Sequence, residues 1–187
     1  MNKLACHLGQ YLARIGLISE DDLEIYEYGI QCELEIMLFI LFSSYIAYLF
    51  EMPLEYSIFL LMFMPIRSYT GGLHLKKYST CLVCSLLTLV FVMTFAKYVS
   101  FPIQLTVFIS AILLLVLWNI PPVNHKNREI NVQEEYHLRV NLRKILCVVA
   151  ITIIFFTVFK LCRVLVVQAV TLLIIVISLI LGKMHNS

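Results

Sequence analysis

The most reactive pairing of side chains in this sequence is a histidine, His74, followed seven residues later by a cysteine, Cys81. Two glycines, Gly71 and Gly72, precede the histidine in a polar segment that lies between two apolar runs. A thiolate is a strong nucleophile, and a neighbouring imidazole can take its proton and later return it to a leaving group. These two side chains are therefore the smallest set that can carry out covalent acyl transfer.

The spacing of the pair limits how it can work. Seven residues of straight helix rise about 10 Å, whereas a hydrogen bond needs about 3 Å. The chain must therefore fold back or bend between His74 and Cys81, and Gly71 and Gly72 provide permissive backbone just before the histidine. A helix over 80–96 places Cys81 in its first turn, where the helix dipole favours a thiolate.

The neighbours of the pair leave several alternatives open. We predict Ser79 as the N-cap of that helix. Arg67 either extends to lipid phosphates or helps to bind substrate and fix the loop over 67–80. Cys84 is a rival nucleophile that lies deeper in the bilayer and ionises less readily. The Cys81/Cys84 spacing also occurs in redox pairs and zinc sites, but no second pair accompanies it, so we predict no metal or cofactor.

The composition indicates an integral membrane protein. Of 187 residues, 61% are hydrophobic and 14% are charged, with a mean hydropathy of +0.91, whereas soluble domains average near 25% charged residues. We expect one all-α membrane domain over 1–187. The net charge of +2 is too small to suggest nucleic acid as a partner. Residues 1–31 contain acidic residues where a cleavable signal would have its apolar core.

Six apolar runs are candidate membrane segments because a bilayer core of about 30 Å requires roughly 20 helical residues. The second and fifth runs are short, so they are either thin spans or partly re-entrant. The predicted fold is a polytopic helical bundle with about six membrane segments. The six runs are 32–50, 52–66, 80–96, 102–120, 145–159 and 164–181.

The basic residues predict the orientation. If all six runs cross with the N-terminus inside, 11 basic residues lie inside and three outside, as the positive-inside rule favours. The reactive loop over 67–80 and the polar loop over 121–144 then lie at the cytoplasmic face. If 52–66 did not cross, the reactive loop would be extracytoplasmic. The three outside residues are Lys97, Lys160 and Arg163.

Two polar regions contain short predicted helices. One is an interfacial helix over 133–143. The other is an amphipathic helical region within 1–31, which either lies on the membrane surface or acts as a lid or substrate-docking helix beside the reactive loop. Its apolar residues at helical spacing are Leu4, Leu8, Tyr11, Leu12 and Ile15.

Arg67, Gly72, His74 and Cys81, in a loop that leads into a membrane helix, resemble the signature of the accessory gene regulator B (AgrB) family of bacterial membrane cysteine endopeptidases. The likeness covers nearly the whole chain. The tyrosine-glycine segment Glu24–Ile30 before the first run is similar to the family pattern. So is the proline-marked segment from Trp118 to Lys126.

The resemblance implies a specific activity. Such a protein cleaves the C-terminal part from a short autoinducing-peptide precursor through an acyl-enzyme thioester and promotes thiolactone or lactone cyclisation for quorum sensing. Cys81 would be the nucleophile and His74 its base, with Arg67, Gly71 and Gly72 as supporting motif positions. The implied partners are the propeptide, membrane lipid and a second copy in a homodimer, and the implied location is the bacterial cell membrane.

Two non-enzymatic functions remain as alternatives. The chain could be a transporter or channel subunit, although the predicted spans have few of the ionisable residues that mark such a pathway. It could instead be a structural partner of a sensor kinase. Substitution of His74 and Cys81 would leave either function intact.

Overall fold

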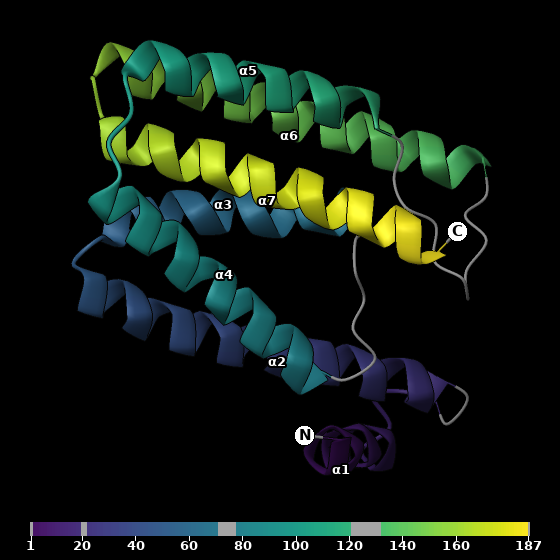
Figure 1. Cartoon of the computed structure of the whole chain (residues 1–187). Helices are drawn as coiled ribbons and strands as arrows, with labels where there is room; N and C mark the ends of the chain where they lie inside the picture. The colour runs from purple at the N-terminus through teal and green to yellow at the C-terminus, as the bar shows by residue number, and fades with distance from the viewer. Residues whose placement is uncertain (1, 20–21, 71–77, 121–131, 187) are drawn as a thin grey trace.

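The computed structural model describes residues 2–19, 22–70, 78–120 and 132–186. These residues form seven helices and no strand, which confirms the all-α prediction. In chain order (Figure 1), the helices are α1 (Asn2–Arg14), α2 (Leu23–Phe50), α3 (Pro53–Thr70), α4 (Tyr78–Tyr98), α5 (Ile103–Asn119), α6 (Val132–Val158) and α7 (Cys162–Asn186). Helices α2, α6 and α7 contain apolar stretches long enough to cross a membrane, and α4 and α5 contain shorter ones. The predicted helical membrane bundle is thereby confirmed.

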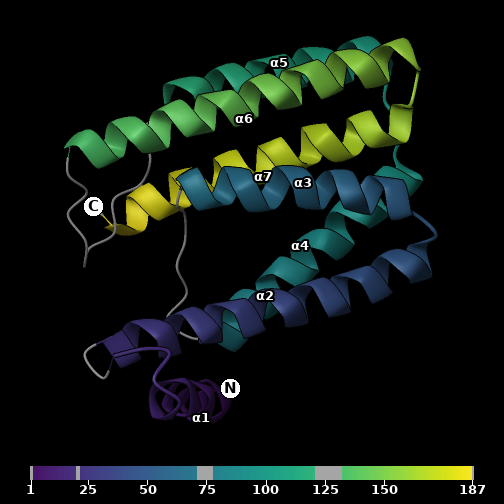
Figure 2. The same cartoon turned by 180° about the vertical axis from the view of Figure 1, so that it is seen from behind.

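Helices α2 to α7 run back and forth, so their connections gather at two ends of the bundle (Figures 1 and 2). We call the end with the short connections 51–52, 99–102 and 159–161 the turn end. Glu51 and Lys160 adopt left-handed conformations there, with φ of 59° and 54°. We call the opposite end the loop end, because α3 finishes and α4 begins there.

Helix α7 forms the centre of the bundle and contacts α3, α4, α5 and α6. Nine consecutive residues, Val164–Leu172, are buried, as expected for a helix that is surrounded by others. Within this stretch the Gln168 amide donates a hydrogen bond of 2.8 Å to the Thr152 hydroxyl of α6. That hydroxyl donates in turn to the carbonyl of Val149 at 2.8 Å. The polar contact therefore joins α6 to the central helix.

The two short runs, 52–66 and 145–159, both belong to longer helices. Helix α6 is one continuous helix of 27 residues. It contains both the predicted interfacial helix over 133–143 and nearly all of the apolar run over 145–159. Its polar first turns are supported by an ion pair of 2.6 Å between Arg139 and Glu135, four residues apart. Hydropathy identified only the apolar part of this helix.

Helix α3 is also longer than predicted. It continues past Pro65 to Thr70 and has 18 residues, which gives a length of about 27 Å. The hydroxyls of Ser68 and Thr70 donate to the carbonyls of Met64 and Ile66, four residues earlier. Helix α3 is therefore one continuous element from Pro53 to Thr70.

Candidate active site

The predicted reactive loop lies between the end of α3 and the beginning of α4. Residues 67–70 belong to α3 and residues 78–80 belong to α4, so the predicted loop over 67–80 is too long at both ends. His74, Gly71 and Gly72 lie outside the described residues, as does the side chain of Cys81. The structure therefore describes the two helices on either side of this segment, and it shows which position along each helix every residue occupies.

Cys81 is the fourth residue of α4, which confirms that it lies in the first turn of a helix. Ser79 is the second residue of the same helix, so the prediction that it is the N-cap is wrong. Eleven residues, or three helical turns, separate Cys81 from Val92, whose side chain is fully buried. Position 81 is thus on the same side of α4 as the residues that pack into the bundle.

The rival cysteine on α4 is oriented differently. Cys84 lies about 60° around the helix from position 81 and is exposed on the surface of α4. The register of α4 thus separates the two cysteines, because Cys84 lies on the outer surface of the helix whereas position 81 is in line with the buried Val92.

The end of α3 is fixed to the core immediately before Gly71. Ile66 and Thr70 are buried, with relative exposures of 0% and 2%. The half-buried Arg67 has its guanidinium carbon 5.4 Å from the centre of the Phe63 ring, one turn earlier in the same helix. Such cation–π contacts stabilise a defined side-chain position. Arg67 is therefore held by α3 itself at the start of the reactive segment.

Helix α2 contributes polar residues that the sequence analysis did not select. Its residues Cys32 and Glu35 are half-buried, in line with the buried Phe39 and Ser43 on one face of the helix. The Gln31 amide donates a hydrogen bond of 2.9 Å to Glu35, and α2 contacts α4. The helical spacing of positions 32, 35, 39 and 43 in the sequence could have predicted that these residues share one inward face of α2.

Another thiol, Cys6 of α1, is in an environment that opposes ionisation. A hydrogen bond with the Glu27 carboxylate, followed by desolvation and then by the negative charge of that carboxylate, raises the pKa of the Cys6 thiol above its ordinary value. Cys6 is therefore a poor nucleophile at neutral pH. Within the described parts of the chain, no cluster of His, Cys, Asp and Glu side chains could hold a metal ion.

The family comparison covers nearly the whole chain. The model of the family AgrB, accessory gene regulator B, matches residues 2–184. The chain belongs to the AgrB family. This finding confirms the resemblance that the motif residues suggested. At the level of the family, it assigns the chain to peptide processing in agr quorum sensing, with a propeptide as its substrate.

Comparison with curated proteins and with solved structures found no match for either. We therefore infer the roles of individual residues in this AgrB-family protein from its own helices and from its motif.

Proposed function

We propose that this AgrB-family protein is a membrane cysteine endopeptidase that cleaves a short autoinducing-peptide precursor and closes the remaining peptide into a ring. The observation that supports this proposal most strongly is the placement of Cys81. It lies in the first turn of α4, on the side of the helix that packs into the bundle. Unpaired backbone N–H groups and the helix dipole favour a thiolate at that position.

The proposed reaction has two acyl-transfer steps. His74 takes the thiol proton, and the Cys81 sulfur attacks a carbonyl carbon of the propeptide. The C–N bond then breaks, and His74 gives the proton to the departing amine of the C-terminal fragment. A thiol or hydroxyl of the bound peptide then attacks the thioester carbon, the C–S bond to Cys81 breaks and the ring forms. The proton of the attacking group passes through His74 to the Cys81 sulfur, which restores the thiol.

The supporting motif residues have distinct proposed roles. Arg67 is held over Phe63 at the end of α3, so it can fix the start of the reactive segment and attract an acidic part of the substrate. Gly71 and Gly72 allow the chain to fold back and bring His74 to Cys81. Backbone N–H groups in the first turn of α4 are suitable donors for the oxyanion.

We propose that α2 to α7 each cross the membrane, with the reactive segment at the cytoplasmic face. Lys97, Lys160 and Arg163 lie in or next to the short connections of the turn end. Among the described residues, Arg67, Arg139, Arg143, Lys144 and Lys183 lie in the halves of their helices that are nearer the loop end. The positive-inside rule therefore places the loop end in the cytoplasm of a bacterial cell. Membrane lipid surrounds the bundle, and a homodimer remains a prediction.

The described core offers little support for the transport alternative. Its buried polar side chains are uncharged, whereas ion and solute pathways through membranes usually contain ionisable groups. These buried polar residues are Ser43, Thr70, Thr106, Ser110, Gln168 and Thr171.

Co-expression with a short candidate propeptide, followed by mass spectrometry of the peptide products, tests the proposal. Cys81→Ala should abolish both the cleaved fragment and the ring, and His74→Ala should reduce them by at least about 100-fold. The matched control is Cys84→Ala, which should process the peptide at nearly the wild-type rate. Processing that survives Cys81→Ala would exclude the proposed nucleophile.

A further inference from the structure

Helix α1 packs across α2 through its smallest residues. Ala5 has a relative exposure of 2%, and Gly9 is buried. A Cβ atom added to Gly9 would lie 2.6 Å from the Glu27 Cγ atom, so a larger residue at this position would have to displace the Glu27 side chain. The contact uses the small residues of α1 and leaves its large apolar side chains, such as Leu8, partly uncovered.

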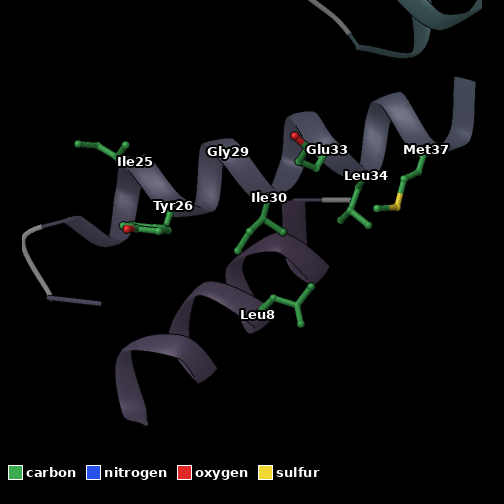
Figure 3. Close-up of a pocket in the computed structure, with 8 residues that line it drawn as sticks. All are labelled: Leu8, Ile25, Tyr26, Gly29, Ile30, Glu33, Leu34 and Met37. Carbon is green, nitrogen blue, oxygen red and sulfur yellow. The ribbon is translucent and has the colours of Figure 1, made fainter. Parts of the chain in front are cut away.

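An apolar groove of about 570 Å³ lies beside this contact (Figure 3). Leu8 of α1 forms part of one side, and the remaining lining residues come from the first four turns of α2. Glu33 is the only charged side chain among them. The apolar lining residues are Leu8, Ile25, Tyr26, Ile30, Leu34 and Met37.

Gly29 has no packing role that explains its presence in this groove. Glycine inside a helix costs about 1 kcal/mol relative to alanine. A Cβ atom at Gly29 would have no heavy atom within 4 Å, in contrast to Gly9. A side chain at position 29 would instead enter the open space of the groove, so Gly29 keeps that space free for an occupant.

The charge around the groove indicates what kind of occupant fits. The described residues 22–35 contain five acidic and no basic residues, and Arg14 lies at the end of α1. Helices that bind anionic lipid surfaces are usually rich in lysine and arginine. A negatively charged surface with an apolar groove is complementary to an amphipathic helix whose polar face is basic.

We propose that the groove between α1 and α2 docks the apolar face of a basic amphipathic helix in the peptide substrate. This inference rests on the proposed function, because it identifies the occupant as part of the propeptide. Helix α2 forms most of the groove and also contacts α4, the helix that contains Cys81. A peptide helix bound in the groove therefore lies on α2, and α2 also contacts α4.

A binding assay with designed peptides tests the docking. The full chain with Cys81→Ala is placed in phosphatidylcholine nanodiscs, and fluorescence anisotropy measures the binding of an 18-residue Leu/Lys amphipathic helix. A Leu/Glu helix with the same leucine positions is the charge control, and empty discs measure binding to lipid. The Leu/Lys helix should bind the protein about tenfold more tightly than the Leu/Glu helix.

Variants of α2 locate the site. Gly29→Leu fills the groove and should weaken binding about fivefold or more, since each excluded CH₂ contact contributes about 0.8 kcal/mol. Ser44→Leu, which enlarges an exposed residue of α2 outside the groove, is the matched control and should leave the affinity unchanged. Glu33→Lys should weaken the Leu/Lys helix and strengthen the Leu/Glu helix.

Several results would overturn the docking proposal. They are equal affinity of the Gly29→Leu and unsubstituted proteins, equal affinity of the two peptides, or binding to empty discs that matches binding to loaded discs. A change of oligomeric mass in Gly29→Leu without a change in peptide affinity would assign the groove to a second copy. Because Cys81 is absent throughout this assay, its failure leaves the proposed cleavage reaction untested and separately testable.

Discussion

The C-terminal and N-terminal parts of this molecule differ sharply in how their helices are covered. In the apolar stretch of α7, 67% of the residues are buried, whereas the corresponding stretch of α2 is only 17% buried. Helix α7 is surrounded by four other helices, and α2 is contacted by α1, α3 and α4. The first region is suited to hold the fold, and the second has free surface for lipid and for ligands.

Helix α4 joins these two regions. Its buried residues Leu89, Val92, Met93 and Ala96 pack into the core, and the helix contacts both α7 and α2. The first turn, which contains Cys81, lies toward α2 in Figure 1. The well-packed helix α7 and the more exposed helix α2, which has the proposed peptide groove, thus both contact α4, the helix that has the proposed nucleophile.

Truncation of the central helix should give the largest loss of stability. Leu172 is fully buried in α7, and we expect Leu172→Ala to lower the free energy of unfolding by about 2–5 kcal/mol. The exposed Leu41 of α2 provides the matched control, with an expected change below about 0.5 kcal/mol. Thermal unfolding in detergent measures both. Similar losses at the two sites would contradict the difference between the regions.

The two glycines of the α1–α2 contact should behave differently. Gly9→Leu would force α1 away from Glu27, and we expect overpacking to cost about 1–3 kcal/mol. Gly29→Leu enters open space and replaces a poor helix former, so it should be neutral or stabilising by up to about 1 kcal/mol. Unfolding of both variants provides the comparison. Destabilisation by Gly29→Leu would show that position 29 is packed.

The ionisation of Cys6 provides a smaller test of the N-terminal region. Glu27 raises the pKa of the Cys6 thiol, so less thiolate is present at a given pH. Glu27→Gln removes the negative charge, and the pKa should fall. Alkylation of Cys6 by iodoacetamide at pH 8 should then become several-fold faster. An unchanged rate would mean that Glu27 does not control this thiol.

The smallest effect is expected at the polar contact between α6 and α7. Gln168 donates to Thr152, while its carbonyl oxygen is buried and has no partner among the residues that the structure describes. Gln168→Leu loses one hydrogen bond and removes an unsatisfied acceptor, so stability should change by less than about 1 kcal/mol. Thermal unfolding measures the difference. A loss as large as that of Leu172→Ala would instead indicate that Gln168 is essential to the core.

The sequence predicted the helical bundle because hydropathy reports which segments can lie in lipid. It failed at the ends of helices for the same reason. The polar first turns of α6 and the last residues of α3 are helical without being strongly apolar, and they depend on local bonds such as Arg139 to Glu135. Hydropathy does not detect such bonds.

The candidate site could be predicted only in part. The motif selected Cys81 as a candidate, and the expected start of a helix at residue 80 placed it in a first turn, a placement that the structure confirms. The α1–α2 groove was beyond prediction because it depends on how two helices cross. The apolar periodicity of α1 indicated Leu8 as a packing residue, but Leu8 is partly exposed, whereas the small residues Ala5 and Gly9 are buried. Glycines in predicted helices were the signal that was overlooked.

The most direct test of the proposed mechanism is to trap the acyl-enzyme. The protein is co-expressed with a propeptide whose ring-closing Cys or Ser is replaced by alanine, so that the second step cannot follow, and its intact mass and peptide map are measured. We predict an adduct with the mass of the N-terminal part of the propeptide, attached to Cys81, released by hydroxylamine and absent from Cys81→Ala. An adduct on Cys84, or cleavage of the propeptide by Cys81→Ala, would contradict the account.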